Sequence, residues 1–183
     1  GSGLVGSEMC IRDSSFIAKA GQGLSWFQST GYTQLINEIN KTKGSKPIAV
    51  VFNLGINDMA NISNYISYMS DIASTLKSKN CKLFYMSVNP INSVMITKAG
   101  KGARTEAQVR EFNSKIHSGL SLNYKYIDTY SVLMKKGYGT NSSYSGTDAA
   151  SDDGLHYTTK TFKRIYYYCI TYLNTGSIDA SIY

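Results

Sequence analysis

Residues 48–58 read Ile-Ala-Val-Val-Phe-Asn-Leu-Gly-Ile-Asn-Asp, and the fold class of the chain can be inferred from them. Residues 48–54 are apolar at nearly every position, which is typical of a parallel strand buried on both faces. Gly55 then lets the backbone turn tightly. Apolar residues recur at helical spacing from there to about Ser78, and Asp58 is the expected N-cap of this helix. The stretch thus predicts the strand, turn and helix from which parallel sheets are built.

Strands and helices alternate along the rest of the chain. A glycine turn, Gly21-Gln22-Gly23, leads from a predicted strand into helical sequence, and Thr105 and Gln108 form a capping-box signature. The further elements expected are strands at Phe16–Ala20, Lys82–Val88 and Tyr124–Ile127, helices over about 24–39, 105–116 and 158–173, and loops over 91–104 and 136–152. Alternation of this kind implies right-handed βαβ units and an α/β fold with a doubly wound parallel sheet.

Polar residues and glycines follow the predicted strands or precede the last helix. They are Gly21, Gly23, Asn57, Asn89, Asp128 and the loop from Asp153 to His156. Ligands of doubly wound sheets bind at the carboxyl ends of the strands. We therefore expect these residues to converge on one edge of the sheet.

The pair of Asp153 and His156 indicates acid–base chemistry. His156 is one of two histidines in the chain and lies three residues after the carboxylate, in a polar loop. A carboxylate at this distance can orient the imidazole ring and stabilise its charged form. An asparagine just past a buried strand, here Asn57, can donate its side-chain amide to a developing oxyanion. The sequence therefore predicts a hydrolase site that needs no metal and no organic cofactor.

Two short motifs connect this site to a known family. Gly55-Ile56-Asn57-Asp58 and Asp153-Gly154-Leu155-His156 resemble the third and fifth blocks of the SGNH, or GDSL-type, hydrolases, which are Gly-x-Asn-Asp and Asp-x-x-His. The resemblance covers Phe16–Leu173 and implies a flavodoxin-like three-layer α/β/α sandwich. It also implies a serine esterase that acts on a small-molecule or carbohydrate ester, with O-acyl and foremost O-acetyl groups as the target. We expect neither a nucleic acid nor a membrane as a partner.

The resemblance implies a role for each candidate site residue. His156 would remove the proton of the serine nucleophile and later protonate the leaving alkoxide, while Asp153 holds the ring in the productive tautomer. Asn57 would donate to the oxyanion, together with the backbone N–H of Gly23 or of Gly21. The residues expected to border the substrate are Gly21, Gly55 and Asn89.

The serine itself is missing from the expected place. The family's Gly-Asp-Ser block ends its first strand, but residues 1–14 read Gly-Ser-Gly-Leu-Val-Gly-Ser-Glu-Met-Cys-Ile-Arg-Asp-Ser. Gly1-Ser2 resembles a tag-cleavage scar, and Leu4–Asp13 resembles the in-frame translation of a sequencing adapter. We therefore expect residues 1–14 to be foreign sequence and residues 15–183 to form the hydrolase domain.

Neither serine of the suspect segment fits the role of nucleophile. Ser14 is preceded by an arginine and an aspartate in place of Gly-Asp. It also abuts the next predicted strand, whereas a parallel crossover needs about a dozen residues. Ser7, after the short apolar stretch Leu4-Val5-Gly6, is the other imitation of the block. Both are poor nucleophile candidates.

Loss of the first strand would leave the sheet incomplete. In a flavodoxin-like strand order of 2-1-3-4-5, that strand lies between Phe16–Ala20 and residues 48–54. Each buried backbone group left unpaired costs on the order of 1–3 kcal/mol. We therefore expect Leu4-Val5, the apolar pair upstream, to supply a surrogate strand, either within its own chain or exchanged in a homodimer.

Composition excludes several classes of protein. At 183 residues with 42% hydrophobic content, the chain is long enough for one domain, and no apolar run approaches the roughly 20 residues of a membrane span. The formal charge of +7 is scattered, which favours a solvated surface over a nucleic-acid patch. Of the three cysteines, Cys10 lies in the suspect segment, and Cys81 and Cys169 are expected to be buried thiols without metal-ligand spacing.

Two alternatives to a carbohydrate esterase stay open. A long apolar pocket would favour a lipid-type esterase or thioesterase. Absence of the family serine favours a catalytically silent protein that only binds its ligand, whereas intact His156, Asp153 and Asn57 favour an enzyme. Some aromatic residues could line a sugar-binding cleft, although packing of helices is the simpler explanation for them: Trp26, Tyr85, Tyr138 and Tyr144.

Overall fold

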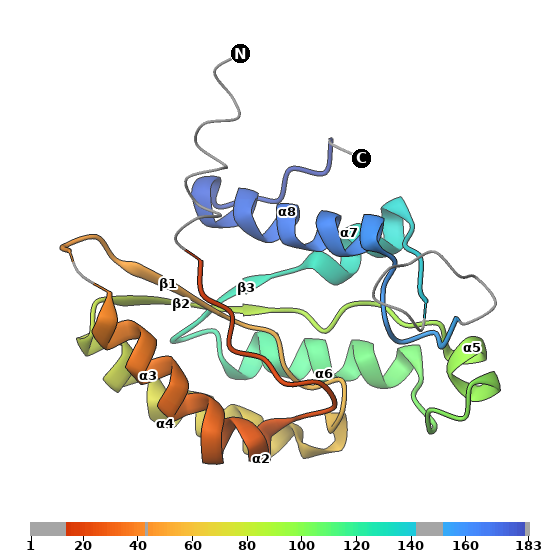
Figure 1. Ribbon diagram of the computed structural model, residues 1–183, viewed down its shortest axis with the longest axis horizontal. Coiled ribbons are helices and arrows are strands. Elements are labelled where there is room, and N and C mark those ends of the chain that lie inside the picture. Colours follow the sequence, from red (N-terminus) through yellow and green to blue (C-terminus); the bar gives the residue numbers. More distant parts are fainter. Residues whose placement is uncertain (1–13, 43, 142–151, 182–183) are drawn as a thin grey trace.

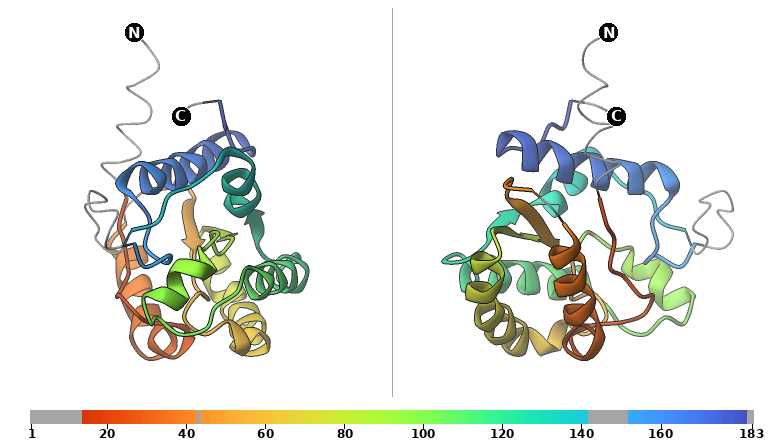
Figure 2. Two further views of the ribbon diagram at one scale, coloured as in Figure 1. Left: turned by 90° about the vertical axis from the view of Figure 1, so that its right-hand side faces the viewer. Right: turned by 60° about the vertical axis from the view of Figure 1, so that its left-hand side comes forward.

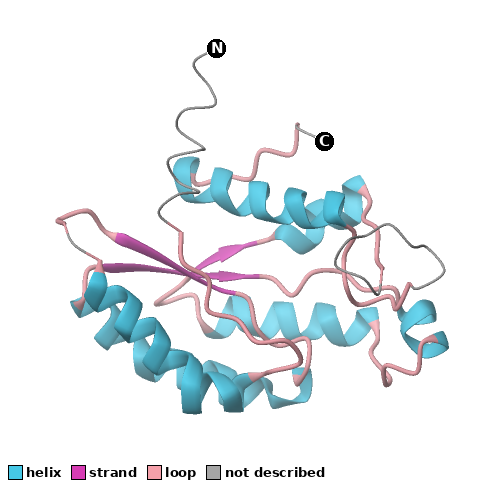
Figure 3. Ribbon diagram, viewed as in Figure 1, coloured by secondary structure: helices cyan, strands magenta, loops and turns pink. Residues whose placement is uncertain are grey.

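One small parallel sheet forms the centre of the fold. A computed structural model describes residues 14–42, 44–141 and 152–181. Within these residues the strands lie side by side in the order β1 (Ile48–Phe52), β2 (Cys81–Met86) and β3 (Lys125–Ile127). Helices cover both faces of this sheet (Figure 1, Figure 3). The chain therefore has the mixed α/β character and the parallel strand pairing that its sequence predicts.

The helices form a layer on each side of the sheet (Figure 2). The layer below the sheet in Figure 1 consists of α2 (Leu24–Trp26), the π-helical segment η1 (Phe27–Gly31), α3 (Tyr32–Lys41), α4 (Ile62–Ser78) and α6 (Glu106–Gly119). The layer above the sheet consists of α7 (Thr129–Lys136) and α8 (Thr159–Thr175). Two short helices, η2 (Met59–Asn61) and α5 (Ser93–Lys98), lie in the loops that follow β1 and β2.

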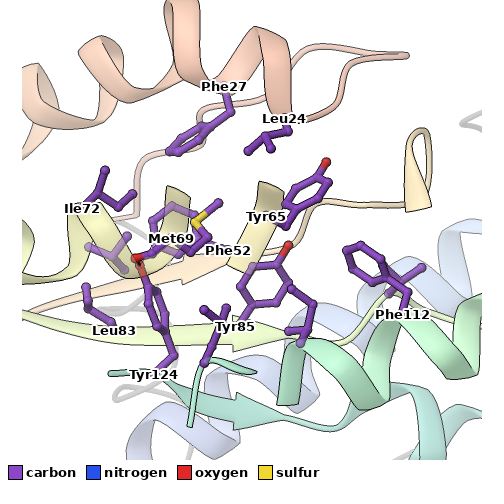
Figure 4. Close-up of a cluster of buried hydrophobic side chains, with 14 of the residues drawn as sticks. Leu24, Phe27, Phe52, Tyr65, Met69, Ile72, Leu83, Tyr85, Phe112 and Tyr124 are labelled. Atoms are coloured by element: carbon purple, nitrogen blue, oxygen red, sulfur yellow. Dashed lines mark hydrogen bonds between the residues drawn. The ribbon is translucent and has the colours of Figure 1, made fainter. Parts of the chain in front are cut away.

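Side chains of the strands alternate between two hydrophobic clusters. The lower cluster receives Val50, Phe52, Leu83 and Tyr85 from the strands, and the upper cluster receives Phe84, Met86 and Ile127. Figure 4 shows the lower cluster, in which the Phe27 ring packs edge-on against Phe52 with 5.5 Å between the ring centroids. Burial on both faces explains why the strands read as nearly continuous apolar runs.

The predicted strand Phe16–Ala20 is wrong. Residues 14–19 belong to no helix or strand and carry no ladder hydrogen bonds, and Phe16 is 77% exposed. The ring of Phe16 contacts Tyr166 of α8, with 6.1 Å between the centroids. In the described part of the chain, β1 pairs only with β2, so this segment has no neighbouring strand with which to form a ladder.

The surrogate strand expected at Leu4-Val5 lies outside the described residues. Exchange of this segment in a homodimer therefore stays a prediction. The described strands β1, β2 and β3 are adjacent in the same order as the last three positions of the expected 2-1-3-4-5 arrangement.

Two short helices occupy stretches for which no helix was predicted. α5 lies within the expected loop 91–104, and the Asn92 side chain caps it by accepting from Met95 N at 3.2 Å. α7 starts after Asp128, whose carboxylate accepts from Ser131 N at 3.0 Å. Both helices are too short for apolar periodicity to reveal them, and in each the N-cap residue is the remaining sequence signal.

Other local predictions are confirmed. Thr105 and Gln108 form the complete capping box at the start of α6. Cys81 is buried, and Cys169 is partly buried in α8, where burial raises its pKa to about 11. None of the described helices combines the length and apolar character needed to cross a membrane.

Candidate active site

Asp153 and His156 form a hydrogen-bonded pair in the loop before α8. Nδ1 of His156 lies 2.7 Å from Oδ2 of Asp153. The other carboxylate oxygen, Oδ1, accepts from the backbone N–H groups of Leu155 and His156, both at 3.0 Å. The Asp153 side chain is 2% exposed, whereas the His156 side chain is 35% exposed. The structure thus brings the two predicted residues together as a buried carboxylate beneath a partly accessible imidazole.

The protonation state of Asp153 follows from these contacts. Burial raises its pKa, but hydrogen bonds from the His156 amide, the His156 ring and the Leu155 amide lower it by more, so the carboxyl pKa lies below its ordinary value. Asp153 is therefore ionised at neutral pH. An ionised carboxylate accepts from Nδ1–H, and this tautomer leaves Nε2 as the basic nitrogen of the neutral ring.

The loop that carries this pair is fastened to the segment after β2. The carbonyl oxygen of Gly154 accepts from Asn92 N at 2.8 Å, and the Tyr157 hydroxyl donates to Pro90 O at 2.9 Å. Gly154 has φ +70°, and a Cβ at this position would overlap the carbonyl oxygen of Asn92. A glycine is therefore required where the loop meets the N-terminus of α5.

Asn57 lies on the turn that follows β1. Its Nδ2 donates to the carbonyl oxygen of Gln22 at 2.8 Å, and the residue is exposed. Gly55, at the start of this turn, has φ +125°, and a Cβ there would overlap the Phe112 ring. The turn thus depends on glycine for both its backbone conformation and its packing, as the sequence predicts for Gly55.

Asp58 does not cap the helix that follows it, which corrects the prediction. Its side chain makes no hydrogen bond to the N-terminus of η2 or α4. Instead, Oδ2 accepts from Leu24 N at 2.9 Å and Oδ1 accepts from the Tyr65 hydroxyl. A Cβ on Gly23 would overlap the same carboxylate. Asp58 therefore caps α2 across the fold and holds the 21–24 turn against the turn of Asn57.

The two halves of the candidate site lie at the same end of the sheet. The turn after β1 and the loop before α8 both lie beyond the carboxyl ends of the strands (Figure 1, Figure 2). Asn57 contacts the glycine turn through Gln22, and the Gly154 loop contacts the residues after β2. Gly21, with φ +71° and no described atom within 4 Å of an added Cβ, is exposed beside them.

Asn89 has a different place from the one expected. It is 5% exposed, and its Oδ1 accepts from the Thr129 hydroxyl at 2.6 Å. The Thr129 oxygen lies 3.0 Å from the Ser87 hydroxyl, which in turn accepts from Tyr130 N. This buried network ties the end of β2 to the start of α7, so Asn89 supports the strand ends instead of bordering a ligand.

The serines considered as nucleophiles do not complete the site in the described residues. Ser7 lies outside them. The hydroxyl of Ser15, the residue after Ser14, donates to Glu38 Oε2 at 3.2 Å, so this end of the segment lies beside the C-terminal half of α3. The described residues also contain no group of His, Cys, Asp and Glu that could hold a metal ion.

The aromatic residues proposed for a sugar-binding cleft are mostly structural. Tyr85 is 1% exposed and donates its hydroxyl to Leu54 O at 3.0 Å within the core, so of the two alternatives it packs the fold. Tyr138, partly buried, donates to Ile91 O at 2.7 Å. Trp26 is partly buried among core side chains, and Tyr144 lies outside the described residues.

Two surface hollows of about 300 and 390 Å³ lie beside α4 and α3, and neither is lined by Asn57 or His156.

Arg104 contacts the turn of Asn57, although no pattern in the sequence selects it. Its Nε donates to Ile56 O at 3.0 Å, and its Nη2 lies 3.4 Å from Asn57 Oδ1. This second contact joins residues that are 47 positions apart. No local sequence pattern predicts the contact between Arg104 and Asn57, because the glycine-containing loop before Arg104 has the composition of an ordinary surface loop. Comparison with family models, with curated proteins and with solved structures gives no match, so the resemblance to SGNH hydrolases rests on the two short sequence motifs.

Proposed function

We propose that this chain carries the acid–base and oxyanion groups of an SGNH-type ester hydrolase. The substrate class that this likeness favours is an O-acyl, foremost O-acetyl, ester of a carbohydrate. One observation carries the proposal: a buried, ionised Asp153 accepts a hydrogen bond from Nδ1 of His156 in a loop at the carboxyl end of a parallel sheet. That contact leaves Nε2 as the proton-accepting atom.

Each remaining group has a role in ester cleavage. His156 takes a proton from the attacking nucleophile and returns it to the departing alkoxide, while Asp153 keeps the ring oriented. Asn57 Nδ2 and the backbone N–H of Gly23 donate to the oxyanion that forms on the acyl carbonyl. Of the two glycines, Gly23 is preferred because the carboxylate of Asp58 fixes its turn directly beside Gln22, the residue that Asn57 contacts.

Because residues 1–14 lack the family's Gly-Asp-Ser block, we expect water to act as the nucleophile. His156 Nε2 accepts a proton from water as the oxygen adds to the acyl carbon. The bond between that carbon and the alcohol oxygen then breaks, and the alkoxide receives the proton from the imidazolium. The products are the carboxylic acid and the alcohol. Without an acyl-enzyme intermediate this route is slow.

We expect weak hydrolysis of p-nitrophenyl acetate that depends on His156. General-base catalysis contributes about 10²- to 10⁴-fold to a rate. In His156→Gln we therefore expect only the background hydrolysis that buffer and surface side chains cause. The matched control is His117→Gln, because His117 is the second histidine and stacks on Tyr126, with 4.3 Å between the ring centroids. Equal initial rates for His156→Gln and the unaltered protein would refute the proposed function. Retained ester binding with no turnover would identify the silent ligand-binding alternative.

A serine-directed phosphonate should leave Ser7 and Ser14 unmodified. Neither hydroxyl is expected to be activated by His156, and an unactivated serine reacts poorly. Intact-mass measurement after prolonged incubation, followed by peptide mapping, checks this expectation. Stoichiometric labelling of either residue would mean that a nucleophile has been recruited, and it would replace water in the scheme above.

A further inference from the structure

The side chain of Arg104 bridges the loop after α5 and the turn of Asn57. Its Nη1 donates to Lys101 O at 2.6 Å, within its own loop. Its Nε donates to Ile56 O at 3.0 Å, and Nη2 donates to Asn57 Oδ1 at 3.4 Å. The guanidinium thus contacts the backbone immediately before Asn57 and the side chain of Asn57 itself. Arg104 is only partly exposed, which limits its freedom to leave these acceptors.

These contacts select one orientation of the Asn57 amide. Arg104 donates to Oδ1, and Nδ2 donates to the carbonyl oxygen of Gln22 at 2.8 Å. A flip of the amide by 180° would direct its NH₂ group at the cationic guanidinium and its oxygen at the Gln22 carbonyl. Both contacts would then be repulsive, because a guanidinium accepts no hydrogen bond and two oxygens cannot share one. The network therefore keeps the NH₂ group on the side of the glycine turn.

The charge of Arg104 acts on the same amide. Among the described residues, the ion pairs are made by Lys41, Lys115 and His156, so no described carboxylate neutralises Arg104. A cation at the amide oxygen polarises the group and strengthens its N–H donors. The position of Arg104 therefore favours both the direction and the strength of hydrogen-bond donation by Nδ2.

We propose that Arg104 is a positioning residue for Asn57, which it orients and polarises as the side-chain donor to the oxyanion. The link to the oxyanion rests on the proposed function, whereas the coupling of Arg104 to Asn57 does not. Arg104 itself makes no contact with substrate in this scheme. Its guanidinium acts through the Asn57 amide, so replacing it should alter the chemical step and leave substrate affinity unchanged.

Nuclear magnetic resonance of the Asn57 side-chain amide tests the coupling without any need for activity. The two Nδ2 protons are assigned by their absence in Asn57→Asp. In Arg104→Ala they should move toward the shifts of an unrestrained asparagine and exchange faster with water, and Arg104→Lys should restore them only in part, because lysine lacks the planar fork. The control is Lys101→Ala, which removes one positive charge from the same loop but keeps the backbone carbonyl that Arg104 contacts. Unchanged Asn57 resonances in Arg104→Ala would overturn the proposal.

Turnover of p-nitrophenyl acetate tests whether the orientation of Asn57 by Arg104 affects ester hydrolysis. Removing an oxyanion donor lowers kcat by about 10²- to 10³-fold, so loss of its orientation should lower kcat by roughly tenfold with KM unchanged. In the Asn57→Ala background, Arg104→Ala should have no further effect. Additive effects of the two substitutions, or a change in KM alone, would contradict a role through Asn57. If turnover does not depend on His156, the proposed function fails, and the amide resonances still decide the coupling. Arg104→Lys, which keeps the charge, provides the same comparison should Arg104→Ala unfold.

Discussion

Replacing Asp153 with alanine will lower the free energy of unfolding by about 3 to 5 kcal/mol, because it removes three hydrogen bonds to a charged group, each of which contributes about 1.5 kcal/mol. The carboxylate accepts from two backbone N–H groups and from the His156 ring, and all three donors lose their partner in the variant. Asp152→Ala is the matched control, because its side chain is more exposed and, among the described residues, accepts only from Gly154 N. We expect that control to cost about 1 kcal/mol. Urea unfolding at pH 7 measures both, and equal losses would contradict the buried pair.

The contribution of Asp153 should also depend on pH. Its folded-state pKa lies below its ordinary value, so the unfolded chain takes up the proton first as the pH falls. The stabilisation is therefore fully present above the unfolded pKa of about 3.9 and disappears as the pH drops through the lower folded pKa. The difference in unfolding free energy between the unaltered protein and Asp153→Asn should be constant above about pH 5 and shrink below about pH 4. A difference that grows with acidification would have the wrong sign for this carboxylate.

Features set by neighbours in the sequence could be predicted. The apolar run at 48–52 forms the buried strand, and the Thr105–Gln108 box starts α6 where expected. The Asp153–His156 contact also spans only three residues. In each case the partners lie within about one helical turn of each other, so the pattern itself fixes the geometry.

Features set by distant partners were missed or assigned wrongly. Phe16–Ala20 has the composition of a strand, but a strand exists only beside another strand, and none is adjacent in the described residues. Asp58 stands where an N-cap belongs, yet its carboxylate accepts from Leu24 and Tyr65. Asn89 and Arg104 likewise find their partners 40 and 47 positions away. Such contacts are decided by tertiary packing, which a single sequence does not display.

Among the glycines that the structure describes, we expect Gly154 to be the one of comparable backbone conformation whose replacement by alanine destabilises the fold most. Gly154 has φ +70°, and its added Cβ would overlap Asn92 O and lie 2.7 Å from Ile96 N. Gly100 is the matched control, since it has φ +65° but no described atom within 4 Å of an added Cβ. The positive φ costs about 1 to 2 kcal/mol in both variants. Overlap with fixed backbone should add about 1 to 3 kcal/mol at Gly154 alone.

The same substitution should move the Asp153–His156 pair away from the rest of the candidate site. Backbone atoms of Asn92 and Ile96 cannot yield as a flexible side chain could, so the 152–157 loop must move away from α5 to make room for the methyl group. Asp153 and His156 move with it, because the Gly154 carbonyl would lose its hydrogen bond from Asn92 N. We therefore expect Gly154→Ala to abolish the turnover that depends on His156, whereas Gly100→Ala keeps it at equal folded fraction. Thermal unfolding and initial rates, measured on both variants, check this expectation. Equal stability of the two variants would show that the 152–157 loop does not pack against α5. Another contact would then have to hold Asp153 and His156 in place.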